Sequence, residues 1–269
     1  MNYVEKAYDE MPEVEWSRLE RHRVEYGLTM RALADYLPSA PAAVADIGGS
    51  TGRYAIELTR RGYSVTLADV SQKCLDFAQL KAAEMGVELA GVVKTDARDL
   101  SDLADESFDA VLVMGPMYHL LAHAQRLEAL REARRILRPG GYVIAAFISR
   151  FCIVQYAAAE RVDYIRTFED ELNSILNTGI YLHSESSEGF PDAWFAHPDE
   201  IVPLMSEAGL EEPDLMACEP LAYCLEEGIN AASPELHAQW IDLLYRLCRE
   251  PSILGAGGHL LCMGKKAKR

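Results

Sequence analysis

Short apolar runs alternate with amphipathic segments along the first 150 residues of the chain. The apolar positions between 13 and 37 recur at helical spacing and predict one helix that ends before Pro38. Strands are then expected at 43–47, 63–69, 90–94, 108–113 and 142–148, and helices at 52–61, 72–85 and 124–137. Strands that alternate with helices in this way predict an α/β fold with a doubly wound parallel sheet.

This alternation stops after Arg150. The stretch 151–196 contains a helical segment and a polar loop at 184–189, and it is too long for an ordinary connection. A helix over 198–208, strands at 212–219 and 258–264, and a helical segment at 234–249 bring the expected sheet to seven strands. We therefore expect one domain with four parts: a helical cap (1–40), a ligand-binding core (41–149), a lid or substrate insertion (150–197) and the C-terminal part of the sheet (198–269).

A glycine-rich turn follows the first expected strand. Asp46 stands near the carboxyl end of that strand, and Gly48, Gly49 and Gly52 come directly after it. Glycine lets the backbone approach a ligand and adopt positive φ, and the start of the next helix offers unpaired N–H groups. The turn is therefore expected to hold a small polar ligand at the edge of the sheet.

Acidic residues end three successive strands of the predicted sheet. A carboxylate in such a position is costly unless donors satisfy it, so Asp46, Asp69 and Asp96 together indicate a ligand rich in donors. A ribose diol suits Asp69, an adenine amino group suits Asp96, and an ammonium group suits Asp46.

Charge and cysteine content narrow the possible partners. The formal net charge of −16 argues against nucleic acid and against an anionic membrane surface as partners. The first 20 residues are acidic without an apolar core, so we expect no signal peptide and a cytoplasmic protein. The six cysteines form no Cys-x-x-Cys pair and have no histidine at metal-ligand spacing, so we expect reduced thiols and no metal.

Several stretches together resemble the class I S-adenosylmethionine-dependent methyltransferases, of the type 11/25-like superfamily. The resemblance covers roughly 40–150, and it rests on Ala45–Ala55, Val65–Ser71, Thr95–Ala97, Phe108–Leu120 and Leu130–Gly141. It implies a Rossmann-like methyltransferase fold and S-adenosyl-L-methionine as the cofactor. A nicotinamide dinucleotide is the rival cofactor, but it requires a Gly-x-Gly-x-x-Gly spacing that the turn lacks.

The resemblance also implies roles in the glycine turn. Asp46, Gly48 and Gly52 would line the methionine part of the cofactor, with Gly49 and Ser50 completing the turn. The family usually has glycine where this chain has Ser50; we expect that a serine can still fit there, with Gly49 beside it, and that binding is kept.

Residues beyond the turn would bind the remainder of the cofactor. The resemblance implies that Asp69 binds the ribose hydroxyls and that Val70 lies against adenine. Asp96 and Ala97 would hold the adenine edge, and Met114 would lie under the sulfonium.

The segment after the fourth strand offers candidates for the acceptor site. His119 is a candidate general base, because its ordinary pKa is near neutrality; alternatively it holds its loop or orients the cofactor. Tyr118 is a second candidate catalytic residue or a wall of the site, and Met117 is a further substrate-binding candidate.

Three more residues are candidates for substrate binding. Arg150 could pair with a substrate carboxylate or phosphate, or with a surface acid. Trp194 could form an aromatic pocket wall or pack the lid against the sheet. Tyr26 could cover the cofactor or belong to the core.

The sequence thus predicts an enzyme that transfers the methyl group of S-adenosylmethionine to a small-molecule acceptor by in-line displacement. Two alternatives stay open: a methyltransferase acting on a tRNA base or a protein, and a cofactor-binding protein without methyl transfer. The protein is expected to be a monomer or a homodimer. The sequence leaves the identity and the atom type of the acceptor open.

Overall fold

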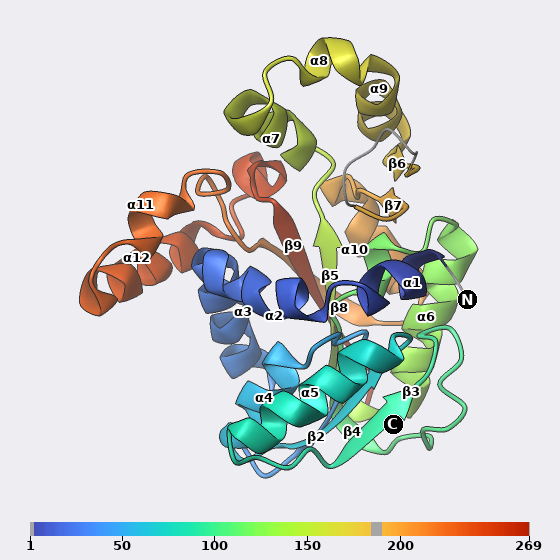
Figure 1. Ribbon diagram of the computed structural model, residues 1–269. Coiled ribbons are helices and arrows are strands. Elements are labelled where there is room, and N and C mark those ends of the chain that lie inside the picture. Colours follow the sequence, from blue (N-terminus) through green and yellow to red (C-terminus); the bar gives the residue numbers. More distant parts are fainter. Residues whose placement is uncertain (1–2, 184–189, 269) are drawn as a thin grey trace.

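A seven-stranded sheet forms the centre of the molecule (Figure 1). The computed structural model describes residues 3–183 and 190–268. The strand order is β3-β2-β1-β4-β5-β9-β8, with β1 Ala43–Ile47, β2 Ser64–Asp69, β3 Gly91–Lys94, β4 Phe108–Val113, β5 Leu137–Ile148, β8 Glu211–Ala217 and β9 His259–Lys265. Strands β1 to β5 pair in parallel, whereas β9 is antiparallel to both β5 and β8. The predicted fold class, a mostly parallel seven-stranded α/β sheet, is confirmed.

Successive residues of the central strands point to opposite faces of the sheet, and each face has its own core. Val111 packs in the cluster that includes α6 (His123–Ile136) and α10 (Pro198–Glu207), whereas Leu112 packs in the cluster on the other face. That second cluster includes α3 (Arg23–Tyr36), α4 (Arg53–Arg60), α5 (Gln72–Glu84) and α12 (Pro234–Leu247). Because the strands are buried on both faces, they read as continuous apolar runs in the sequence.

The N-terminal region differs from the single helix expected over 13–37. It consists of α1 (Tyr3–Asp9), α2 (Pro12–Arg21) and α3, with a break at His22. His22 leaves the helical conformation (φ −100°, ψ 63°), and its Nδ1 lies 2.6 Å from Oε1 of Glu226, at the start of α11 (Glu226–Asn230). A tertiary contact therefore accompanies a break that the apolar periodicity does not reveal.

Residues after β5 form a lobe beyond the carboxyl ends of the strands, at the top of Figure 1. It contains α7 (Cys152–Glu160), α8 (Tyr164–Thr167), α9 (Glu169–Thr178) and the paired short strands β6 (Ile180–Tyr181) and β7 (Ala193–Trp194). The polar loop expected at 184–189 lies outside the described residues. The helices α1 and α2 run between this lobe and the lower part of the sheet.

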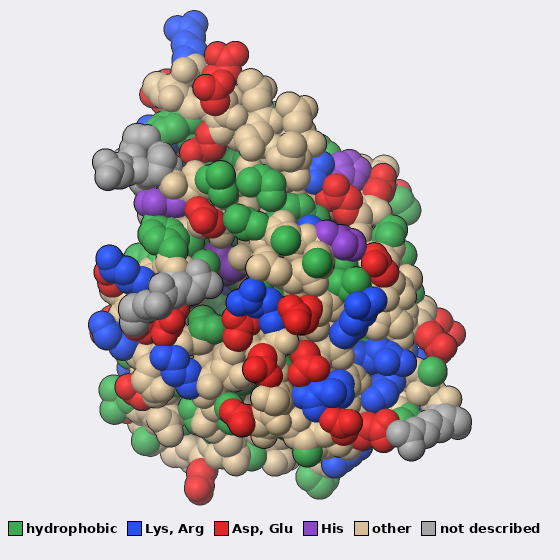
Figure 2. Space-filling view, turned by 90° about the vertical axis from the view of Figure 1, so that its right-hand side faces the viewer, with side chains coloured by type: hydrophobic (Ala, Val, Ile, Leu, Met, Phe, Trp, Pro, Cys, Tyr) green, Lys and Arg blue, Asp and Glu red, His purple; other side chains and the backbone are tan. Residues whose placement is uncertain are grey.

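Two further observations bear on partners. Among the helices that the structure describes, none combines the length and apolarity needed to cross a membrane. Lys and Arg side chains are interspersed with Asp and Glu side chains over the lower half of the face shown in Figure 2.

Candidate functional site

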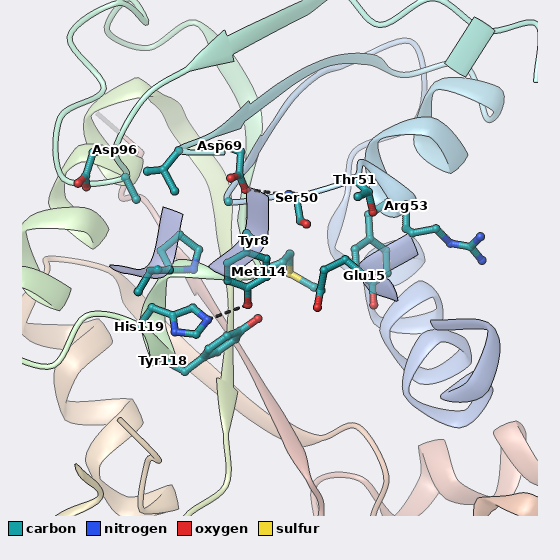
Figure 3. A pocket seen from close by; sticks show the side chains of 18 of the residues that line it. Tyr8, Glu15, Ser50, Thr51, Arg53, Asp69, Asp96, Met114, Tyr118 and His119 are labelled. Atoms are coloured by element: carbon teal, nitrogen blue, oxygen red, sulfur yellow. Dashed lines mark hydrogen bonds between the residues drawn. The ribbon is translucent and has the colours of Figure 1, made fainter. Parts of the chain in front are cut away.

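A pocket lies at the carboxyl ends of β1, β2 and β4, where ligands bind in open α/β sheets (Figure 3). The turn after β1, the ends of β2 and β3 and the loop after β4 form one side, and α1 and α2 close the other. Of the predicted site residues, ten line this pocket: Gly48, Gly49, Ser50, Asp69, Val70, Asp96, Ala97, Met114, Tyr118 and His119.

The turn after β1 places three residues in the left-handed region. Gly48, Ser50 and Gly52 have φ of 67°, 49° and 75°. A Cβ atom at Gly48 would lie 2.4 Å from Cδ of Pro116, so this glycine lets the two loops approach each other. The departure at Ser50 is accommodated, because the serine adopts the positive φ that glycine usually supplies.

Asp69 connects the turn to the end of β2. Its Oδ2 accepts the Ser50 amide at 2.8 Å and its Oδ1 accepts the Ser71 amide at 2.8 Å. Burial raises the pKa of Asp69, and these backbone amides oppose the rise. Each carboxylate oxygen has further acceptor capacity, so Asp69 can hold its own loop and still accept hydroxyl donors from a ligand in the pocket.

Asp46, which was expected to help line the methionine part of the cofactor, does not line the pocket. The side chain is fully buried, and a Cβ atom at Gly49 would lie 2.6 Å from its Cγ, so Gly49 covers it. Neither carboxylate oxygen has a hydrogen-bond partner of normal geometry among the described residues. Burial, together with the nearby Asp69, raises the pKa of Asp46 to about 7.

Asp96 lines the far end of the pocket but is paired with its neighbour Arg98. Its Oδ1 accepts Nε of Arg98 at 2.9 Å and its Oδ2 accepts Nη2 at 2.6 Å. The hydrogen-bonded guanidinium lowers the pKa of Asp96. A ligand amino group at this end would therefore share the carboxylate with Arg98.

The loop after β4 carries His119 just beyond the short 3-10 helix η1 (Pro116–Tyr118). His119 Nδ1 lies 3.0 Å from the Asp192 carbonyl oxygen, and Nε2 lies 2.8 Å from the Tyr8 hydroxyl (Figure 3). A carbonyl only accepts, so Nδ1 carries the proton and Nε2 accepts from Tyr8. Burial lowers the pKa of His119 to about 4, and the ring is neutral with both nitrogens occupied.

Helices α1 and α2 complete the pocket; a helical cap over 1–40 was expected from the sequence, but the residues through which it contributes were not. The Ser71 hydroxyl donates to Oδ1 of Asp9 at 2.6 Å, and Lys94 Nζ donates to Glu5 at 2.8 Å. Glu15 and Arg18 of α2 line the pocket, and burial raises the pKa of Glu15. These contacts join residues distant in sequence, so the clue available to sequence reasoning was limited to the acidic character of the segment.

Five other predicted site residues do not line the pocket. Met117 is fully buried in the core, and Tyr26 stacks on Tyr54 with ring centroids 5.7 Å apart. Gly52 begins α4 instead, as its N-cap. Arg150 and Trp194 are the remaining two.

Arg150 and Trp194 have structural partners within the protein. Both Glu200 carboxylate oxygens accept from Nη2 of Arg150, at 3.0 and 2.8 Å. The Arg126 guanidinium lies 3.6 Å from the ring centroid of Trp194, which belongs to the core. For each side chain the structure thus shows the alternative to substrate binding that the sequence left open: an ion pair for Arg150 and packing for Trp194.

A second cavity of about 340 Å³ adjoins the first at the carboxyl end of β5. The lobe and the start of β9 enclose it, and Arg18 lines both cavities. Tyr118, a wall of the first cavity, packs against the apolar cluster that surrounds the second. Burial raises the pKa of Tyr118 well above its ordinary range, so its hydroxyl stays protonated.

A buried ion-pair network stands beside the second cavity. Arg18 Nη1 and Nη2 donate to the Glu25 carboxylate at 2.7 and 2.8 Å, and Nδ1 of His259 lies 2.8 Å from Oε1 of Glu219. Burial alone raises the pKa of Glu25, but Arg18 and His259 outweigh it and lower that pKa to about 2. Burial lowers the pKa of His259, and the two carboxylates more than reverse this.

The grouping of Glu25, Glu219 and His259 also has donor atoms close enough to hold a metal ion. The Arg18 guanidinium already binds both oxygens of Glu25, and a second cation there would face its charge. We therefore interpret the group as an ion-pair network.

Comparisons with known proteins find a methyltransferase domain that includes the glycine turn after β1. A family model described as "Methyltransferase domain" matches residues 44–141. A ubiquinone biosynthesis O-methyltransferase of Ruegeria pomeroyi is 30% identical over 184 residues, which cover 68% of this chain and 66% of the relative. The chain spans between about two fifths and two thirds of the length of such curated relatives.

Solved structures show the same fold over nearly the whole chain. An S-adenosylmethionine-dependent methyltransferase of Thermotoga maritima, titled a possible histamine N-methyltransferase, is 19% identical with a TM-score of 0.59, covering 97% of this chain and 98% of that one. The [4+2]-cyclase SpnF is 17% identical with a TM-score of 0.55, covering 90% and 80%. Residues 44–141 thus match the methyltransferase domain, and the chain has the fold of the class I S-adenosylmethionine-dependent methyltransferases.

The pocket fits the cofactor of that family. Gly48 and Gly49 form a cradle that a Cβ atom would fill, and Asp69 presents a buried carboxylate beside it. The Glu15 carboxylate faces the same pocket from α2 and suits a cationic amino group (Figure 3). The donor and acceptor groups of S-adenosylmethionine therefore have counterparts among the described residues.

Proposed function

We propose that this protein transfers the methyl group of S-adenosylmethionine to a small-molecule acceptor. The observation that carries the proposal is the pair of adjoining cavities: one has the glycine cradle and Asp69, and the other is enclosed by the lobe. The curated relatives named ubiquinone biosynthesis O-methyltransferase support a small-molecule acceptor. The cytoplasmic location stays a prediction from the sequence.

We assign the cofactor contacts as follows. Asp69 would bind the ribose hydroxyls, Val70 and Ala97 would flank adenine, and the Asp96 carboxylate would accept from its amino group. The turn from Gly48 to Ser50 would hold the methionine part, with Glu15 rather than the covered Asp46 facing the ammonium group. Met114 lines the pocket between these two ends (Figure 3).

When bound, S-adenosylmethionine supplies a methyl group already activated by a sulfonium. The protein's contribution is then mainly proximity, alignment and exclusion of water. His119 serves here as a positioning residue: its Nε2 lone pair is engaged by Tyr8, so it holds α1 over the pocket. Tyr118 forms part of the wall and, being protonated, can donate a hydrogen bond.

Isothermal titration calorimetry with S-adenosylmethionine and with NAD tests the cofactor assignment. We expect binding of S-adenosylmethionine alone, and at least tenfold weaker binding after Asp69→Asn, which removes the charge from a carboxylate that accepts two amides. Asp76→Asn is the matched control, because Asp76 is exposed on α5 and interacts with Gln72. Equal binding by both variants would contradict the assignment.

A labelling experiment tests the acceptor class. The protein is incubated with S-adenosylmethionine labelled in its methyl group and with a cell extract, which is then separated into small-molecule, RNA and protein fractions. We expect the label in the small-molecule fraction. Label confined to RNA or protein would favour the macromolecular alternative, and label in no fraction would favour cofactor binding without transfer.

A further inference from the structure

The second cavity has the size and enclosure of a ligand site. Its volume of about 340 Å³ lies within the range of roughly 300–1,000 Å³ found for small-molecule sites. Ile148 of β5 and His259 of β9 form its base, while residues of α7, α8 and α9 form its roof. Most of the lining comes from the stretch 150–197, which the sequence analysis expected to be a lid or substrate insertion.

Aromatic side chains form one wall. Tyr181, Phe190 and Phe195 all line the cavity, and each ring contacts the other two with centroids 6.2–6.4 Å apart. Tyr164 and Phe168 add a stacked pair, 4.8 Å apart. Aromatic rings prefer edge-to-face or offset-stacked neighbours, so this wall favours a flat aromatic ligand.

The charged groups at the inner end of the cavity balance one another. Arg18 and His259 line it, and both are paired with buried carboxylates, those of Glu25 and Glu219. At the outer end, the Tyr164 hydroxyl donates to Glu171, and the Arg161 guanidinium lies 5.3 Å from the ring centroid of Phe168. A ligand with a net charge would lose its hydration in the cavity without gaining an ion pair, because the charged side chains there already pair with one another.

The cavity is separated from the cofactor pocket by a thin layer of side chains. Arg18 faces both cavities, and the His119 ring lies 5.6 Å from the ring of Phe190 between centroids. A molecule in the second cavity therefore needs to reach only past Arg18, Tyr118 and His119 to touch the first. These three side chains define the junction of the two sites.

We propose that the second cavity binds the methyl acceptor, and that the acceptor is an uncharged aromatic compound whose reactive end lies at this junction. That the ligand is the methyl acceptor rests on the proposed function, whereas the class of ligand is inferred from the cavity itself. The aromatic side chains favour binding of an aromatic ring, and the balanced charges disfavour binding of a charged ligand.

Calorimetry with 1-naphthol and with 1-naphthalenesulfonate, in the full-length protein, tests this inference. Ile153→Trp fills the cavity from α7, because Ile153 lines it. Val154→Trp is the matched control, because the adjacent Val154 is 47% exposed and does not line the cavity. Titration with S-adenosylmethionine is run on every variant as an independent readout of folding and of the cofactor pocket.

We expect 1-naphthol to bind the wild type and Val154→Trp equally, and at least tenfold more weakly to Ile153→Trp. We expect the sulfonate to bind the wild type at least tenfold more weakly than 1-naphthol. Three outcomes would overturn this inference alone, provided that S-adenosylmethionine still binds. These are no binding of 1-naphthol, equal binding of 1-naphthol to both variants, and equal binding of the sulfonate and 1-naphthol to the wild type. Failure of the wild type to bind S-adenosylmethionine would instead overturn the proposed function, and the acceptor role with it.

Discussion

The hydroxyl of Tyr8 donates a 2.8 Å hydrogen bond to Nε2 of His119, joining the first helix to the loop after β4 across 111 residues of sequence. The same imidazole donates from Nδ1 to the carbonyl of Asp192 in the lobe. One neutral ring thus connects the cofactor pocket, the roof of that pocket and the lobe.

Tyr8→Phe removes this connection without changing the ring. We expect S-adenosylmethionine to bind up to about tenfold more weakly, in line with the ~0.5–1.5 kcal/mol of a neutral hydrogen bond. Loss of the donor that favours the neutral imidazole should also move the pKa of His119 upward from about 4, measurable by NMR titration. Tyr3→Phe, on the same helix but 43% exposed, is the control and should change neither quantity.

Substitution of Ser50 should change the free energy of unfolding little, whereas substitution of Gly48 should lower it. Ser50→Gly relieves the positive φ of 49°, and we expect a change in unfolding free energy within about 1 kcal/mol and unchanged cofactor affinity. Gly48→Ala forces a Cβ atom to within 2.4 Å of Pro116 and should cost roughly 1–3 kcal/mol or more. Urea denaturation and calorimetry measure both effects. A tolerant Gly48→Ala would show that the two loops can separate freely.

Asp46 should make the protein less stable as the pH rises. Its pKa is about 7 in the folded protein and about 3.9 when unfolded, so the folded state holds the proton more tightly. Stability is then greatest below pH ~4 and falls by up to about 4 kcal/mol by pH ~7, at 1.36 kcal/mol per pKa unit. Asp46→Asn should lose this dependence when urea denaturation is compared at pH 5 and 8. Parallel pH profiles for the two proteins would refute the account.

Glu25 should contribute the opposite pH dependence. With its pKa lowered to about 2 from an unfolded value near 4.3, its stabilisation is present above pH ~4 and lost as the pH falls through 2. Glu25→Gln leaves the half-buried Arg18 and His259 with one carboxylate between them, and we expect a loss of up to about 3–5 kcal/mol. Glu20→Gln, at a largely exposed site paired with Arg53, should change thermal stability by less than about 1 kcal/mol.

The sequence revealed the central sheet because its strands are apolar on both faces. Strands β1, β2 and β4 match the expected runs within one residue at either end, and the acid at the end of β2 indeed lines the pocket. The strand β5 begins at Leu137 rather than at 142, because it continues back through Pro139 and Gly140 beside Phe108 at the start of β4.

The missing parts of the site are those made by polar contacts between distant segments. Helix α1 attaches through Glu5, Tyr8 and Asp9, none of which adds to an apolar pattern. The sequence left open whether Arg150 binds substrate or a surface acid, for a related reason. Its position at the end of β5 was read correctly, but its partner Glu200 could be found only by knowing how the lobe folds back onto α10.

Because the seven residues of α1 help to close the cofactor pocket, ligand exchange depends on how often this short helix detaches. A single helix of two turns has little stability of its own, so its attachment rests on the contacts of Glu5, Tyr8 and Asp9. Turnover limited by release of the spent cofactor would then follow the fraying rate of the first helix rather than the rate of chemistry. The turnover rate would then be set by helix α1, which is far in sequence from the glycine turn.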